Sequence, residues 1–111
     1  FSQTLDCSKL KNIKAYNPDY PKKTFTIKGA TQESYDNGVL QLLWSVKWLS
    51  DCEYEITCTK KLVESQMEVG DKIIMTIISI DGDCVTVKRT FHAKNFPDGD
   101  MDPENTYCIS K

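Results

Sequence analysis

Two charged residues, Glu33 and Arg89, stand at positions where the strand patterns direct side chains toward the protein interior. An unpaired charge in an interior is costly, whereas a paired charge is tolerated. We therefore predict that Glu33 and Arg89 meet, either as a structural ion pair or as polar anchors for a ligand. The alternative is a strand bulge that exposes one of them.

Aromatic side chains gather on the same predicted surface. They are Phe25, Tyr35, Trp44, Trp48 and Tyr54. Aromatic residues dominate the cores of small domains, so packing is the first interpretation. Lining a ligand pocket is the second, and it makes these residues candidate ligand contacts together with Glu33 and Arg89.

Other chemistry finds little support in the sequence. His92 is the only histidine, and no nucleophile can be tied to it by a motif. The acidic segment 98–104 carries carboxylates that suit Ca²⁺, but it lacks the spacing of an EF-hand loop, and a solvated loop is the simpler interpretation. There is no phosphate loop or nucleophile elbow. We expect a protein that is not an enzyme and has no metal or cofactor.

The element that must position these residues is a hairpin over residues 39–58. Leu40, Leu42, Trp44, Val46 and Trp48 alternate with mostly polar residues, as in a half-buried strand. The segment 52–58 alternates in the same way. A three-residue loop at 49–51 brings the two apolar faces together, pairing Trp48 with Cys52 and Val46 with Tyr54.

Two further turns set the neighbouring strands. Asn37-Gly38 is typical of a type I′ turn, and it pairs Tyr35 with Leu40 and Glu33 with Leu42. We expect the strand before it to run from residue 24 to residue 35, with Gly29 as a bulge or bend opposite Val46. A turn at 81–82 returns a strand that directs four side chains inward. These are Val85, Val87, Arg89 and Phe91.

The chain of 111 residues is long enough for one domain, residues 1–111. Counting alternating segments gives seven or eight strands, including a last one at 106–110. Successive hairpins favour an all-β antiparallel meander that closes into a small barrel, with a β-sandwich as the alternative. Such a barrel either fills its interior or holds one small ligand.

Composition bears on compartment and partners. Five cysteines are many for a short cytosolic protein and lack zinc-site spacing, which favours an exported protein with one or two disulfides. The odd count leaves one thiol free or bridging two chains, so we expect a monomer, with a disulfide-linked dimer as the alternative. A net charge of −2 and scattered lysines argue against nucleic-acid binding. No apolar run reaches the roughly 20 residues of a transmembrane helix. Because the chain begins at Phe1, we expect a mature or trimmed product.

Three segments carry a resemblance to a known group. They are Asp-Cys-Ser-Lys-Leu-Lys-Asn at 6–12, Thr-Ile-Lys-Gly with the following Gln-Glu at 26–33, and Val-Lys-Trp-Leu-Ser-Asp-Cys-Glu-Tyr-Glu-Ile at 46–56. The chain resembles small exported proteins of Bacteroidota bacteria that have a lipocalin-like β meander and no established function. The resemblance implies a disulfide between Cys7 and Cys52, the cysteines inside the matching segments. A second bridge from Cys58 to Cys108 is a further expectation.

These observations predict a secreted or periplasmic barrel that binds a small apolar or amphipathic molecule. The alternative is a structural or interaction module of the cell envelope, which has a filled core and uses a strand edge or a loop surface against a protein partner.

Overall fold

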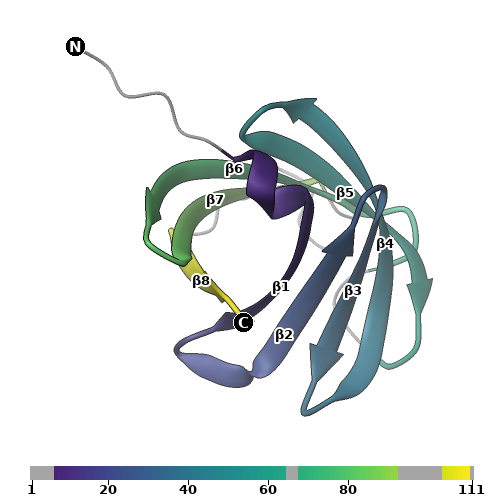
Figure 1. Ribbon diagram of the computed structural model, residues 1–111. Coiled ribbons are helices and arrows are strands. Elements are labelled where there is room, and N and C mark those ends of the chain that lie inside the picture. The colour runs from purple at the N-terminus through teal and green to yellow at the C-terminus, as the bar shows by residue number, and fades with distance from the viewer. Residues whose placement is uncertain (1–6, 65–67, 93–103, 111) are drawn as a thin grey trace.

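A computed structural model describes residues 7–64, 68–92 and 104–110. Within these residues, a short 3₁₀ helix precedes eight antiparallel strands that form a closed barrel, each strand pairing with the next and β1 with β8 (Figure 1). The elements are η1 (Ser8–Lys11), β1 (Asn12–Asn17), β2 (Tyr20–Lys28), β3 (Thr31–Asp36), β4 (Val39–Ser50), β5 (Glu53–Lys61), β6 (Lys72–Asp81), β7 (Cys84–His92) and β8 (Asn105–Ile109). The predicted meander and small barrel are confirmed.

The two ends of the barrel are built differently. At one, which we call the helix end, η1 lies at the same end as the turns that follow β2, β4 and β6 (Figure 1). The amide of Gly29 in the turn after β2 donates a 3.1 Å hydrogen bond to the carbonyl of Lys11. A disulfide from Cys7 to Cys52 ties the start of η1 to the β4–β5 turn, as the resemblance implied. At the other, the cavity end, lie the β1–β2 and β3–β4 turns and the connection between β5 and β6. In the described part of the chain, no helix has the length and apolar character of a membrane span.

The Asn37-Gly38 turn forms as predicted. Both residues have positive φ angles, 53° and 79°, and Tyr35 pairs with Leu40. The strand expected from residue 24 to residue 35 is wrong, because the chain reverses at Gly29, whose φ is +59°. Val46 then donates a 2.8 Å backbone hydrogen bond to the carbonyl of Ala30. Gly29 is therefore a turn residue and not a strand residue opposite Val46.

Bulges change the predicted registers. The β4–β5 pair has Trp48 opposite Tyr54 and Val46 opposite Ile56, because the register shifts between Trp48 and Ser50 and the three-residue loop is absent. In the β6–β7 pair the turn is one residue later than predicted, so that Asp81 pairs with Cys84. The faces survive these shifts, and Val85, Val87, Arg89 and Phe91 still face the interior.

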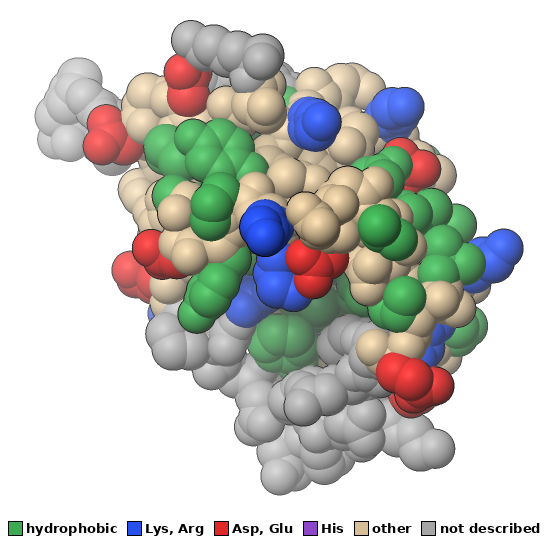
Figure 2. Space-filling view, turned by 90° about the horizontal axis from the view of Figure 1, so that it is seen from below, with side chains coloured by type: hydrophobic (Ala, Val, Ile, Leu, Met, Phe, Trp, Pro, Cys, Tyr) green, Lys and Arg blue, Asp and Glu red, His purple; other side chains and the backbone are tan. Residues whose placement is uncertain are grey.

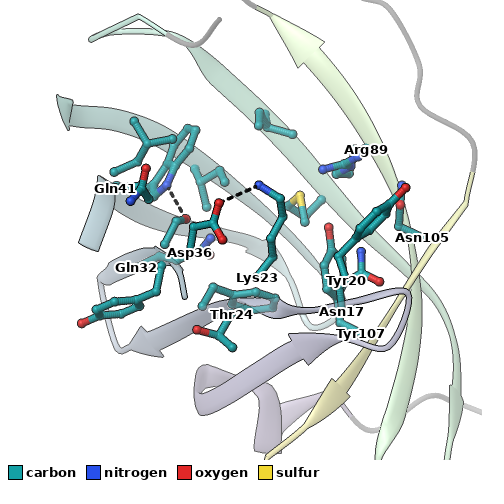
Figure 3. A pocket seen from close by; sticks show the side chains of 18 of the residues that line it. Asn17, Tyr20, Lys23, Thr24, Gln32, Asp36, Gln41, Arg89, Asn105 and Tyr107 are labelled. Atoms are coloured by element: carbon teal, nitrogen blue, oxygen red, sulfur yellow. Dashed lines mark hydrogen bonds and ion pairs between the residues drawn. The ribbon is translucent and has the colours of Figure 1, made fainter. Parts of the chain in front are cut away.

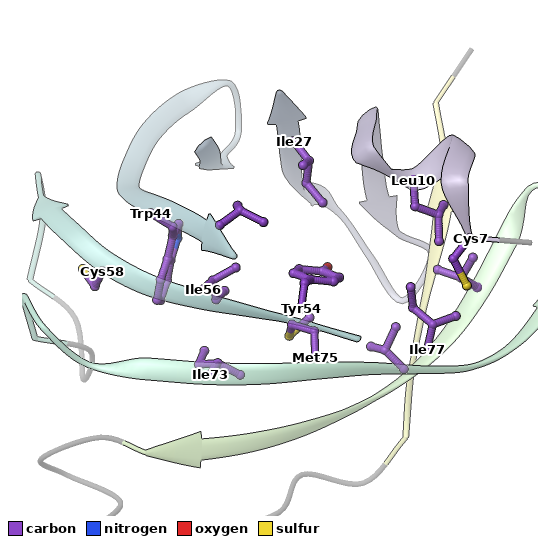
Figure 4. Packing of buried hydrophobic residues seen from close by; sticks show 13 residues of the cluster. Cys7, Leu10, Ile27, Trp44, Tyr54, Ile56, Cys58, Ile73, Met75 and Ile77 are labelled. Atoms are coloured by element: carbon purple, nitrogen blue, oxygen red, sulfur yellow. The ribbon is translucent and has the colours of Figure 1, made fainter. Parts of the chain in front are cut away.

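The core follows the inner faces of the strands (Figure 4). Its buried members are Cys7, Leu10, Ile27, Trp44, Val46, Tyr54, Ile56, Cys58, Ile73, Met75, Ile77, Val85 and Val87. Leu10 from η1 is 2% exposed and Ile27 is 1% exposed, so the helix end is filled with side chains. Burial of these apolar surfaces is the main stabilising term of a domain of this size.

Candidate functional site

The interior at the cavity end is hollow. A cavity of about 610 Å³ lies between the inner faces of the strands, a volume within the usual range for small-molecule sites. Its apolar walls come from five strands and from the β5–β6 connection. They are Phe25, Leu42, Trp44, Ile56, Val63, Ile73, Met75 and Tyr107. Apolar atoms that line a space of this size lack protein packing partners on one side, and a bound molecule would supply such contacts.

Polar and charged side chains line the same cavity. Lys23 and Asp36, paired across β2 and β3, form an ion pair with a 3.5 Å separation between Nζ and Oδ2 (Figure 3). Arg89 extends from β7 on another side of the cavity. Figure 2, a view from below, shows basic and acidic side chains next to a hollow with apolar side chains inside it. A space with apolar walls and a few polar groups suits an amphipathic molecule.

One indole is held in place by a hydrogen bond. Nε1 of Trp44 donates to Oγ of Ser34 at 3.0 Å, and both residues line the cavity (Figure 3). The bond satisfies a buried donor and fixes the orientation of the ring. Trp44 therefore presents a rigid aromatic wall to whatever the cavity contains.

Two aromatic rings close another wall. Phe25 and Tyr107 pack edge to face, with centroids 5.1 Å apart and an interplanar angle of 86°. Burial raises the pKa of the Tyr107 phenol, and the positive charge of Arg89 acts in the opposite direction. The phenol of Tyr107 is therefore a neutral hydroxyl at ordinary pH, next to a guanidinium.

Gln32 is the polar residue that the sequence reasoning missed. It lies opposite Trp44 on β3, lines the cavity, and is only 5% exposed. Its Oε1 has no hydrogen-bond partner among the described residues. The register shift between Ser34 and Tyr35 places Gln32 and Ser34 on the inner face. The sequence does not mark this bulge. The neighbouring turn has the regular two-residue form that Asn37-Gly38 predicts, so the pattern gives no reason to expect an extra residue in the strand.

The same shift overturns the prediction for Glu33. This residue pairs with Leu43 and does not line the cavity, so the predicted meeting of Glu33 with Arg89 is wrong. Its Oε1 instead accepts a 3.1 Å hydrogen bond from the hydroxyl of Tyr35. Arg89 does face the cavity. The structure contains a bulge, as the predicted alternative required, but it leaves Glu33 half-buried and not exposed.

The candidate aromatic contacts divide between the two ends. Trp44 and Tyr35 line the cavity. Trp48 and Tyr54 pack on each other outside it, with centroids 4.7 Å apart, and Nζ of Lys11 lies 5.3 Å from the Trp48 ring centroid. Trp48 and Tyr54 are thus packing residues of the helix end, which was the first interpretation of the aromatic cluster.

The cysteines form two disulfides in the described chain. Cys7 pairs with Cys52 as expected, whereas Cys108 pairs with Cys84 on the neighbouring strand and not with Cys58. Cys58 is the free cysteine among the described residues, and it is buried. Burial raises the pKa of its thiol. The thiol is therefore shielded from a partner chain, which argues against the predicted disulfide-linked dimer as the alternative state.

Other predicted sites contribute nothing to the cavity. His92 ends β7 with an exposed side chain. Most of the acidic segment, residues 98–103, lies outside the described residues, as do residues 65–67 within the β5–β6 connection. Within the described ranges, no three His, Cys, Asp or Glu side chains are grouped as a metal site would require.

Comparisons with models of protein families, with curated proteins and with solved structures found no match.

Proposed function

We propose that this protein binds one small amphipathic molecule inside the cavity end of its barrel and catalyses no reaction on it. The observation that carries the proposal is the coexistence of a filled helix end and a cavity of about 610 Å³ in one small barrel. At about 30 Å³ for each water, this space would otherwise hold about twenty waters, next to apolar walls that hydrate poorly.

The lining supports an amphipathic ligand over a purely apolar one. Trp44, Ile56 and Met75 offer apolar contact at the inner part of the cavity, while Lys23 and Asp36 offer polar contact at its rim. A molecule with one apolar part and at least one polar group would meet both. Arg89 is the candidate contact for an acceptor or anionic group of the ligand.

We further propose that the protein works in an oxidising compartment outside the cytoplasm, secreted or periplasmic. The two disulfides support this location, because such bonds persist mainly in oxidising environments. The resemblance to small exported proteins of Bacteroidota agrees with it.

The alternative of an interaction module has less support. Its first version used an exposed strand edge, and within the described residues each strand has a neighbour on both sides. In both its strand-edge and its loop-surface version the module has a filled core, whereas the cavity end is hollow.

The test is the native mass of the protein, purified gently from its own source, compared with its denatured mass. We expect a discrete extra mass that disappears on denaturation. Tryptophan emission should also change when apolar or amphipathic molecules are added to the stripped protein. Equal masses together with an unchanged emission would contradict the proposal and favour the interaction module.

A further inference from the structure

The carboxamide of Gln32 is an unusual group to find on the wall of this cavity. Gln32 is 95% buried, as its exposed fraction is 5%, and its Oε1 lacks a hydrogen-bond partner among the described residues. A buried polar atom without a partner is destabilising, so native structures rarely keep one. Trp44 is the residue opposite Gln32, and its Nε1 already donates to Ser34.

The position of Gln32 along the barrel matters as much as its chemistry. It pairs with Ile27 on one side, which is 1% exposed, and with Trp44 on the other, which is 4% exposed. Gln32 therefore lies at the inner part of the cavity, where the filled half of the barrel begins. The ion pair of Lys23 and Asp36 is at the rim, with side chains 64% and 46% exposed.

Resting on the proposed function, we infer that Gln32 determines ligand specificity by binding an uncharged hydroxyl or amide N–H group that enters the cavity first. The group donates a hydrogen bond to Oε1 and so removes the cost of the unpaired carbonyl. A carboxylate is a poor match at this depth, because it only accepts hydrogen bonds and would bring its charge among Trp44, Ile56 and Met75. Beyond this group the ligand is apolar along Trp44, Ile56 and Met75, and any second polar group lies at the rim near Lys23 and Asp36.

The inference separates two classes of amphipathic molecule. If Oε1 of Gln32 accepts a hydrogen bond from the ligand, long-chain alcohols and primary amides bind with the polar group inward. If Arg89 alone sets specificity, long-chain carboxylates bind best and Gln32 has no effect. Gln32 and Arg89 lie on different strands, β3 and β7, and Figure 3 shows them on opposite sides of the cavity.

The experiment compares decan-1-ol with decyl methyl ether, which has the same chain but no donor, and with decanoate. Binding is followed by the emission of Trp44 in a Trp48→Phe background, which leaves one tryptophan. We expect the alcohol to bind about tenfold more tightly than the ether and the carboxylate, the effect of one hydrogen bond to a buried, otherwise unpaired group. Gln32→Leu should reduce the ratio of alcohol to ether affinity to near one.

Gln41→Leu is the matched control. Gln41 also lines the cavity, but its Nε2 already donates to the carbonyl of Val39 at 3.1 Å. This variant should keep the wild-type ratio. Gln32→Met serves as a second variant, and the wild-type ratio alone tests the inference if neither Gln32 variant folds.

The failures are distinguishable. Equal affinities for alcohol and ether in the wild type, tightest binding of decanoate, or a tenfold ratio that survives Gln32→Leu would overturn the role of Gln32 and leave cavity binding intact. If none of the three probes changes Trp44 emission and the native and denatured masses are also equal, the proposed function fails, and the inference fails with it. If the probes leave the emission unchanged but an extra mass is present, the inference alone fails.

Discussion

The two ends of the barrel use the same strands for different purposes. At the helix end, Leu10, Ile27 and Tyr54 fill the interior, and a disulfide ties η1 to the β4–β5 turn. At the cavity end the same alternating strands enclose a space of about 610 Å³ and carry charged residues on its lining. The difference teaches that stability and binding can be assigned to separate halves of a small barrel. The packed helix end fixes the positions of the strands, so the cavity end keeps its form without side chains that fill its interior.

The largest predicted effect comes from the disulfide of the helix end. Cys7 and Cys52 are 45 residues apart, and a cross-link that closes a loop of this length stabilises the folded state by about 4 kcal/mol in the chain-entropy estimate. Cys7→Ala/Cys52→Ala should lower the free energy of unfolding by that amount, as measured by urea denaturation.

Cys84→Ala/Cys108→Ala is the comparison variant. Its residues are 24 apart, and the same estimate gives about 3.5 kcal/mol. If the first variant is as stable as the wild type, the helix end is not the part that holds the barrel together.

Two isoleucines allow the packing of the filled helix end to be compared with that of the cavity end. Ile27 packs within the filled half, whereas Ile73 lines the cavity. Truncating a fully packed isoleucine to alanine costs about 3 kcal/mol, while Ile73→Ala should cost nearer 2 kcal/mol because one side of that side chain already faces open space. Chemical denaturation of both variants measures the difference. Equal costs would mean that the cavity end is packed as tightly as the helix end.

Alkaline pH should weaken the helix end through Tyr54. Burial raises the pKa of its phenol well above the ordinary value of 10.0, with a smaller contribution from Tyr107. Because the folded state holds the proton more tightly, this stability is fully present below pH 10 and is lost as pH rises from there toward the folded pKa. The slope is about 1.4 kcal/mol per pH unit.

Tyr54→Phe should flatten this alkaline loss in denaturation curves between pH 9 and about 11.5. Tyr107→Phe should flatten it less, because the positive charge of Arg89 opposes the effect of burial on that phenol. An identical slope in wild type and Tyr54→Phe would show that Tyr54 is not protected from solvent as described.

The smallest effect is a gain. Gln32→Leu removes a buried carbonyl oxygen that has no partner in the described chain, so the ligand-free protein should become more stable by about 1 kcal/mol. Thermal unfolding in the absence of any probe measures it. A clear loss of stability would mean that the Gln32 carboxamide serves the fold and not a ligand.

The sequence predicted the architecture well because alternation and turn chemistry are local. The Asn37-Gly38 pair predicts its turn because both residues accept the positive φ angles that the structure shows. The alternation around Trp44 and Trp48 predicts an inner face. Gly29 was harder to interpret, because the apolar and polar pattern continues through it and a single glycine suits a bend as well as a reversal.

The site was predicted less well, for a physical reason. A bulge adds one residue to a strand without a compositional mark, and a shift of one residue exchanges the two faces. The shift beside Tyr35 therefore put Gln32 in the cavity and left Glu33 outside it. Arg89 was predicted correctly, because the shift in its own hairpin preserves the inner face of β7.

The most direct test of the central claim is methyl NMR of the protein with labelled isoleucine δ1 groups, titrated with decan-1-ol. Ile56 and Ile73 line the cavity, whereas Ile27 and Ile77 belong to the filled half. We predict saturable shifts at Ile56 and Ile73, with Ile27 and Ile77 nearly unchanged. Shifts at Ile27 and Ile77 alone, or no saturable shift at any of the four, would contradict a barrel with a binding cavity at one end and a filled interior at the helix end.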